Sequence, residues 1–245
     1  MPQDIIYRTD LRKLISEEPS EIAIQIVKSY QDTEEEIRGF VLDKFYQKNT
    51  DMDVKRVTGS NHPDYINQPW SYLITDGKRS SIRLDELAKT PEYYLSDIQE
   101  EKPNFVKIGQ DIFIVGDGNN RTIIAKFFFH FNRDKIDEPL LRNVTLTEYV
   151  VDWESLIIKK EIDSLLNETR FAHLSLTLLT DNFSNGCSDK CRWHLYNNEL
   201  DGEDRSIKLT RAELPALLAE LKSDNFLKRL FGRGYSKNLR TNIFF

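Results

Sequence analysis

Hydrophobic residues in the first third of the chain recur mainly at helical spacing. Thr33 and Glu36 fit a capping box, in which each side chain satisfies a backbone N–H group at the start of a helix. The residues that follow keep one face largely apolar as far as Gln47, and an earlier helix is predicted from about residue 20 to residue 30. Residues 48–70 are polar and contain a glycine and two prolines, which predicts a loop or linker.

In the middle third the apolar runs become shorter and favour strands. Residues 71–77 predict a strand and a turn, and residues 80–98 predict a short strand that leads into helical turns. Two further runs, residues 105–108 and 112–115, predict a hairpin joined around Gly109.

The remaining segments predict a mixture of helices and strands. Residues 122–131 have helical spacing, and residues 143–153 alternate as a strand does. Thr210 and Glu213 form a second capping box. The other predicted elements are a helix over residues 153–169, strands over residues 171–179, 191–196 and 206–210, and the capped helix over residues 214–221.

These elements predict an α+β fold in three parts. Residues 1–70 form a helical N-terminal region, residues 71–153 a core, and residues 154–245 a smaller C-terminal α+β unit with a basic tail. No apolar run approaches the length of about 18 residues that a membrane span needs. The N-terminus lacks the basic and apolar segments of a signal peptide, and the chain has only two cysteines, so a cytoplasmic location is expected.

The net charge of −6 argues against broad electrostatic binding to nucleic acid. The charge is uneven, however, because residues 226–245 contain five basic residues and no acidic one. This basic tail is either a solvated chain end or a contact for nucleic acid phosphate or an acidic partner. A protein partner or inhibitor is a further candidate.

The stretch GDGNNRT, residues 116–122, joins the predicted hairpin to the helix that follows it. A glycine-flanked turn from a strand into a helix leaves backbone N–H groups where an anion can bind. Arg121 can add a bidentate contact to phosphate, and Asp117 is suited to bind a metal ion or to orient a hydroxyl group or water. The alternative is a purely structural turn that Asp117 caps.

Residues 111–129, DIFIVGDGNNRTIIAKFFF, resemble the signature of the ParB/sulfiredoxin-like superfamily. In that signature a strand is followed by a Gly-x-x-Arg or Asp-Gly-x-His-Arg turn and by a helix rich in alanine and aliphatic residues. SIRLDEL (residues 81–87) resembles the strand and turn that precede the signature, and NVTLTEYVV (residues 143–151) resembles the strand that follows it. The resemblance covers residues 71–153 and implies a ParB/sulfiredoxin-like core there.

The resemblance implies a nucleotide-dependent enzyme, namely an NTP phosphohydrolase or phosphotransferase that uses ATP or another NTP with Mg²⁺. Many members belong to plasmid, phage, defence or competition systems, which suggests a toxin-like or defence-associated effector. Arg121 would hold the phosphates, Asp117 would lie near the metal, and Glu92, or else Glu86, is the nearest match to a catalytic glutamate. The residues assigned to nucleotide binding are Gly116, Gly118, Asn119, Asn120, Arg121 and Thr122.

Asn120 departs from the Asp-Gly-x-His-Arg pattern, in which histidine stands at this position. Histidine can donate to phosphate and shuttle a proton, whereas asparagine can only donate. Asn120 therefore marks either a chain that binds without catalysis or a substitution that silences an active enzyme. Two alternative functions follow: a nuclease that uses the same turn and the basic tail on DNA or RNA, and a non-catalytic nucleotide-binding module.

Cys187, Cys191 and His194 have a spacing that can supply three zinc ligands, with His173 or Asp189 as a fourth. A structural zinc site usually draws on two separated pairs of ligands, and the sequence has no second cysteine pair. The spacing therefore favours two free thiols near a hairpin turn over a zinc site. A disulfide is the third reading if the protein leaves the cytosol.

Overall fold

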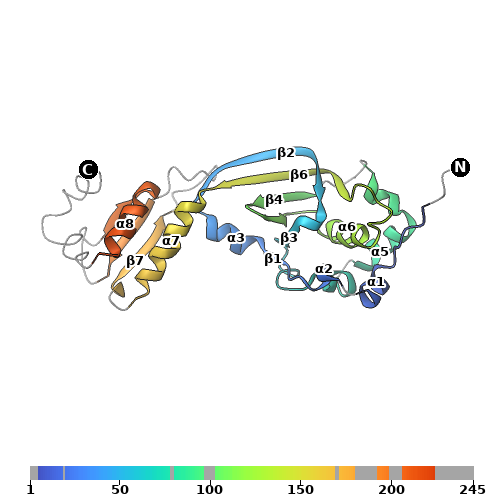
Figure 1. The fold of residues 1–245 in the computed structure, drawn as a ribbon, viewed down its shortest axis with the longest axis horizontal. Coiled ribbons are helices and arrows are strands. Elements are labelled where there is room, and N and C mark those ends of the chain that lie inside the picture. The colour runs from blue at the N-terminus through green and yellow to red at the C-terminus, as the bar shows by residue number, and fades with distance from the viewer. Residues whose placement is uncertain are drawn as a thin grey trace. The chain divides into compact units, whose positions relative to one another are not determined.

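The chain is an α+β protein, as the sequence predicts, and it forms two compact units (Figure 1). The first unit comprises residues 1–36 and 44–150, and the second comprises residues 37–43 and 151–245. A separate N-terminal region ending at residue 70 stays a prediction. The computed structural model describes residues 5–18, 20–77, 80–96, 103–168, 171–179, 192–198 and 206–223.

The first unit is built on a mixed sheet of six strands in the order β1-β3-β5-β4-β6-β2. The strands are β1 (Lys28–Ser29), β2 (Val41–Asp53), β3 (Val57–Ser60), β4 (Asn104–Ile108), β5 (Asp111–Ile114) and β6 (Leu140–Val151). β4 and β5 form an antiparallel hairpin that pairs Phe105 with Ile114, which confirms the hairpin predicted around Gly109. Because β3 lies parallel to β5, Ser60 and Ile114 end their strands at the same edge of the sheet.

The helix α6 (Asn119–Phe131) is the centre of the core in the first unit (Figure 1). Its residues 127–129 are fully buried, and the Nζ of Lys126 donates to the carbonyls of Val54, Lys55 and Val57 at 3.3, 3.0 and 2.8 Å. These bonds fix α6 to the segment that leads into β3. The other helices of this unit are α1 (Leu11–Glu17), α2 (Glu21–Ile24), α3 (Tyr30–Ile37), α4 (Trp70–Thr75) and α5 (Ser80–Lys89), with 3₁₀ turns η1 (Val54–Arg56) and η2 (Pro91–Leu95).

The helix predicted to reach Gln47 is wrong. α3 ends at Ile37, and the chain from Val41 onward forms β2. Thr33 does not cap a helix, because its hydroxyl group lies inside α3 and donates to the carbonyl of Ser29 at 3.0 Å. The apolar residues after Ile37 belong to a strand because β2 pairs with β6, a segment distant in the sequence.

Four further predictions about the first 98 residues need correction. The helix predicted over residues 20–30 is only α2, and the loop predicted over residues 48–70 contains the end of β2, then η1 and β3. The strands predicted within residues 71–77 and 80–98 are the helices α4 and α5. In α4 the buried residues Trp70, Leu73 and Ile74 have the spacing of one helical face, and this burial decides the structure.

The predictions for the two segments that follow the β4–β5 hairpin are confirmed. The predicted helix over residues 122–131 is α6, which begins three residues earlier at Asn119, and the predicted strand over residues 143–153 is β6. None of the helices in the described ranges is long and apolar enough to cross a membrane.

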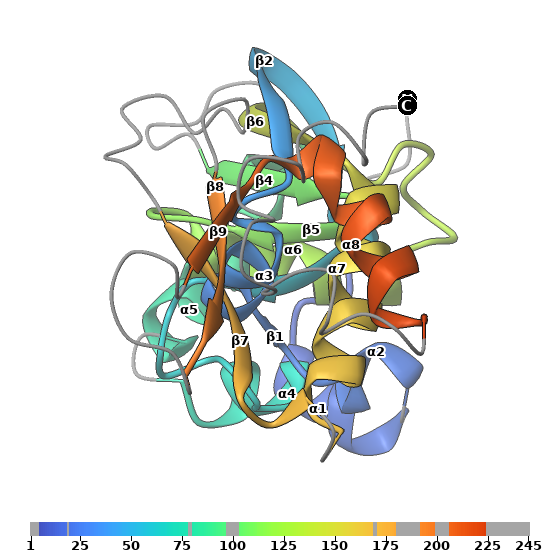
Figure 2. The ribbon, with the colours of Figure 1, turned by 90° about the vertical axis from the view of Figure 1, so that its left-hand side faces the viewer.

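In the described residues of the second unit, the helices α7 and α8 accompany a three-stranded antiparallel sheet, and α7 packs against α8 and β7 (Figure 2). Its elements are α7 (Trp153–Leu166), β7 (Leu174–Leu179), β8 (Arg192–Asn197), β9 (Ser206–Leu209), the 3₁₀ turn η6 (Arg211–Glu213) and α8 (Leu214–Leu221). The predicted helices and strands are confirmed, as is the capping box of Thr210 and Glu213. Cys187, Cys191 and the basic tail lie outside the described residues.

Candidate functional site

The turn between β5 and α6 has the form that its two glycines allow. Gly116 and Gly118 have φ angles of +74° and +96°, in the left-handed region that side chains disfavour. Gly118 is the N-cap of α6, and its carbonyl accepts the first intrahelical bond, from the N–H of Thr122 at 2.9 Å. The N–H groups of the first helical turn have no acceptor within the helix, and helix ends of this kind are favourable positions for an anion.

The two asparagines of the turn fasten a neighbouring loop. Asn119 is buried; its side-chain oxygen accepts from the hydroxyl of Ser60 at 2.7 Å, and its amide nitrogen donates to the carbonyl of Gly116 at 3.0 Å. Ser60 also accepts from the N–H of His62 at 3.0 Å. The Asn119 side chain therefore joins the turn to the end of β3 and to the loop that follows.

This loop is held a second time through Asn120. The hydroxyl of Tyr65 donates to the side-chain oxygen of Asn120 at 3.3 Å, a long hydrogen bond that crosses from the loop to α6. The Tyr65 ring stacks on the imidazole of His62 with centroids 4.2 Å apart. The Nδ1 atom of His62 accepts from the backbone N–H of Asp64 at 3.2 Å, so a neutral His62 carries its proton on Nε2.

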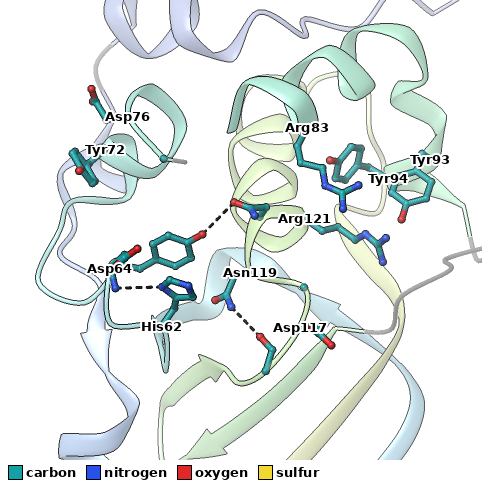
Figure 3. Close-up of a pocket in the computed structure, with 15 residues that line it drawn as sticks. His62, Asp64, Tyr72, Asp76, Arg83, Tyr93, Tyr94, Asp117, Asn119 and Arg121 are labelled. Atoms are coloured by element: carbon teal, nitrogen blue, oxygen red, sulfur yellow. Dashed lines mark hydrogen bonds between the residues drawn. The ribbon is translucent and has the colours of Figure 1, made fainter. Parts of the chain in front are cut away.

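These segments surround a pocket of about 690 Å³ in the first unit. Figure 3 shows His62, Asp64, Tyr72 and Asp76 on one side of it, and Arg83, Tyr93, Tyr94 and Arg121 on the other. The lining is completed by Tyr65, Gly77, Gly116, Asp117, Gly118, Asn119 and Asn120. The volume lies within the range of about 300–1,000 Å³ that is typical of small-molecule sites.

Arg121 is the most buried cation of this lining. The residue is 7% exposed, and its guanidinium lies 4.8 Å from the ring centroid of Tyr93. Burial lowers the pKa of Arg121, and the positive charge of Arg83 lowers it further. Arginine stays protonated at neutral pH despite such shifts, so the pocket wall carries a fixed, desolvated positive charge.

The structure brings six of the seven residues of the GDGNNRT stretch to the pocket. Asp117 lines it and is exposed, whereas Thr122 is fully buried behind it and does not line it. Glu92, at the start of η2, is exposed and is not a lining residue. Glu86 is also exposed, and its carboxylate pairs with Arg83 at 2.8 Å.

A magnesium ion that arrives with a nucleotide needs few protein ligands, since Mg²⁺ is usually held by one or two carboxylates together with phosphate oxygens and water. Asp117 fits that role because it is an exposed carboxylate in the GDGNNRT turn. Within the described ranges, no group of three histidine, cysteine or acidic side chains is placed to hold a metal ion.

The sequence did not point to the residues that complete the pocket. Arg83 lies in the segment predicted to begin as a strand, and His62 and Tyr65 lie in the predicted loop. Ser80, Leu84 and Leu87 face the interior and have helical spacing. This spacing was the signal that could have placed Arg83 on a helix. No family model, curated protein or solved structure matches this chain.

Proposed function

We propose that this protein binds a nucleoside triphosphate in the pocket at the GDGNNRT turn and hydrolyses it or transfers its terminal phosphoryl group. The observation that carries the proposal is the buried guanidinium of Arg121, which lines the same pocket as the N-terminus of α6. A buried arginine beside the N-terminus of a helix favours a multiply charged anion, and phosphate matches both kinds of donor in geometry.

The rest of the pocket suits a nucleotide. Its volume accommodates a ligand of that size, and the Tyr72 ring, which is 39% exposed, offers a face on which a base can stack. The order of strand, glycine turn, helix and strand from β5 to β6 is also the order that the resemblance to the ParB/sulfiredoxin-like superfamily implies. Membership of that superfamily is part of the proposal.

In the proposed reaction the chain mainly positions and stabilises charge. The N–H groups at the start of α6 and the guanidinium of Arg121 meet the charge that spreads over the phosphoryl oxygens in the transition state. Asp117 would hold Mg²⁺, which supplies further charge neutralisation when bound with the nucleotide. An oxygen of water or of an acceptor hydroxyl bonds to the γ-phosphorus, the bond to the bridging oxygen breaks, and a pocket carboxylate accepts the proton.

The second candidate is a non-catalytic nucleotide-binding module, and one observation favours it. The side chain of Asn120 cannot shuttle a proton, and it is engaged by the hydroxyl of Tyr65. A module of this kind binds nucleotide and does not turn it over.

The test measures nucleotide binding and phosphate release for ATP, GTP, CTP and UTP with Mg²⁺. Arg121→Met removes the charge at nearly constant volume, and Arg133→Met, an exposed residue beyond the end of α6, is the matched control. We expect Arg121→Met to weaken binding at least about tenfold, because a charge-assisted hydrogen bond contributes about 1.5–3 kcal/mol. Equal affinity in both variants, with the fold intact by circular dichroism, would refute the proposal.

Asn120→His separates the two candidates. Phosphate release that appears or rises only with histidine identifies an enzyme whose proton-handling residue is absent in this chain. Binding without release in both proteins identifies the module. Binding of single-stranded or duplex nucleic acid, with no affinity for free nucleotide, would support the nuclease instead.

A further inference from the structure

Arg83 brings a second guanidinium to the pocket from a different helix. It lies on α5, whereas Arg121 lies on α6, yet both line the same cavity. Figure 3 shows the two side chains on the same side of the pocket, beside Tyr93 and Tyr94. The pocket therefore concentrates two permanent positive charges on one wall.

The two arginines differ in exposure. Arg121 is buried, whereas Arg83 is partly exposed. Two guanidinium groups that reach one wall from different helices are suited to successive phosphoryl groups of one chain, because each guanidinium presents its own pair of parallel donors.

The arrangement of charge also favours an anionic ligand. Like charges on one wall disfavour each other, and the charge of Arg83 contributes to lowering the pKa of Arg121. Glu86 pairs with Arg83 one helical turn away, but this carboxylate is 52% exposed, and exposed pairs of this kind contribute little free energy. A phosphate can therefore displace Glu86 from Arg83 at small cost.

We propose that Arg83 and Arg121 bind two different phosphoryl groups of the same ligand, so that the pocket selects nucleoside di- and triphosphates over monophosphates. This inference rests on the proposed function and deepens it by naming the ligand class. Arg121 and the N-terminus of α6 hold one phosphoryl group, and Arg83 holds the next one along the chain.

The experiment measures affinity for the tri-, di- and monophosphates of one nucleoside, chosen as the base that the wild-type protein binds best. Arg83→Gln removes the second charge, and Lys89→Gln removes an exposed cation from the same helix, outside the pocket lining. We expect Arg83→Gln to weaken tri- and diphosphate binding about tenfold and to change monophosphate binding less than about twofold. Lys89→Gln should leave all three affinities unchanged.

Two outcomes overturn the inference while leaving the proposed function in place. If Arg83→Gln lowers the affinity for all three nucleotides equally, both arginines bind the same phosphoryl group. If the affinities are unchanged, Arg83 does not contact the ligand. A wild-type protein that binds no nucleotide would refute the proposed function itself. Glu86→Gln gives an independent check, because it removes a carboxylate that competes with phosphate for Arg83 and should retain or raise triphosphate affinity.

Discussion

Replacing Gly118 by alanine should destabilise the first unit more than the same change at Gly116. Both residues have positive φ angles, +96° and +74°. A Cβ added at Gly118 would lie 2.6 Å from the Cβ and 2.8 Å from the Cα of Pro103, distances that require the backbone to move. A Cβ added at Gly116 would meet only the Nδ2 atom of Asn104, at 3.9 Å.

The magnitudes follow from these two effects. A left-handed backbone costs an L-residue about 1–2 kcal/mol, and both variants carry this cost. Overpacking adds about 1–3 kcal/mol, and only Gly118→Ala carries it. We expect a loss of about 1–2 kcal/mol for Gly116→Ala and about 2–5 kcal/mol for Gly118→Ala. Because Gly118 is the N-cap of α6, movement of the turn should also weaken the binding of nucleotide.

Urea unfolding monitored by circular dichroism gives the free energy for each variant, and hydrogen exchange of the α6 amides reports the first unit separately from the second. Equal destabilisation by the two substitutions would refute the reasoning. It would show that the contact between Gly118 and Pro103 relaxes without cost, so that only the φ angles require glycine in this turn.

Two other predictions concern the scaffold. Burial lowers the pKa of Lys126 from the usual 10.5 to about 8. Between about pH 8 and pH 10.5 the unfolded chain therefore binds more protons than the folded chain, and the free energy of unfolding rises with pH over this range. Relative to Lys126→Met, the wild-type free energy of unfolding should increase by about 1 kcal/mol from pH 7 to pH 9, and parallel pH profiles would contradict this. Thr210→Ala removes the hydroxyl of the capping box before α8 and should cost about 1 kcal/mol in urea unfolding, whereas an unchanged midpoint would show that the remaining backbone bond to Glu213 suffices.

The sequence predicted those elements whose local signals agree with their tertiary contacts. The β4–β5 hairpin has two apolar strands and Gly109 at a φ of +59° between them, so the turn residue and the pattern indicate the same structure. α6 follows a glycine N-cap, and all of its apolar residues are buried in the core. The box of Thr210 and Glu213 is equally local, because both partners lie within one turn.

The errors arose where burial, and not local pattern, selects the structure. Trp70, Leu73 and Ile74 fit a helical face, but the short run that contains them also fits a strand, and only the packing of α4 against its neighbouring helices, α6 among them, distinguishes the two. β2 contains Phe45 and Tyr46, both more than half exposed, so its apolar residues do not mark a buried face. Its partner β6 is distant in the sequence, and no local signal connects the two strands.

The candidate site was predictable only in its continuous part. The GDGNNRT stretch supplies one wall of the pocket, and its glycines and arginine are visible in the sequence. The opposite wall comes from residues 62–65 and 72–77, and the second cation comes from Arg83. These segments meet because β3 and β5 end at the same edge of the sheet and because α4 and α5 pack on α6, which are consequences of long-range pairing.

Asn119 and Asn120 have different structural roles in the turn, and the sequence does not reveal which residue has which role. Both polar ends of the Asn119 side chain are engaged within the protein, by Ser60 and by the carbonyl of Gly116, so this side chain positions the turn and is not free to hold phosphate. Asn120 accepts from Tyr65 and thereby holds the loop that carries His62. Phosphate recognition is then left to backbone N–H groups and arginine, which do not titrate near neutral pH. Binding should therefore vary with pH only as the ligand's own phosphate groups ionise, and an affinity that follows any other ionisation would refute this assignment of the phosphate contacts.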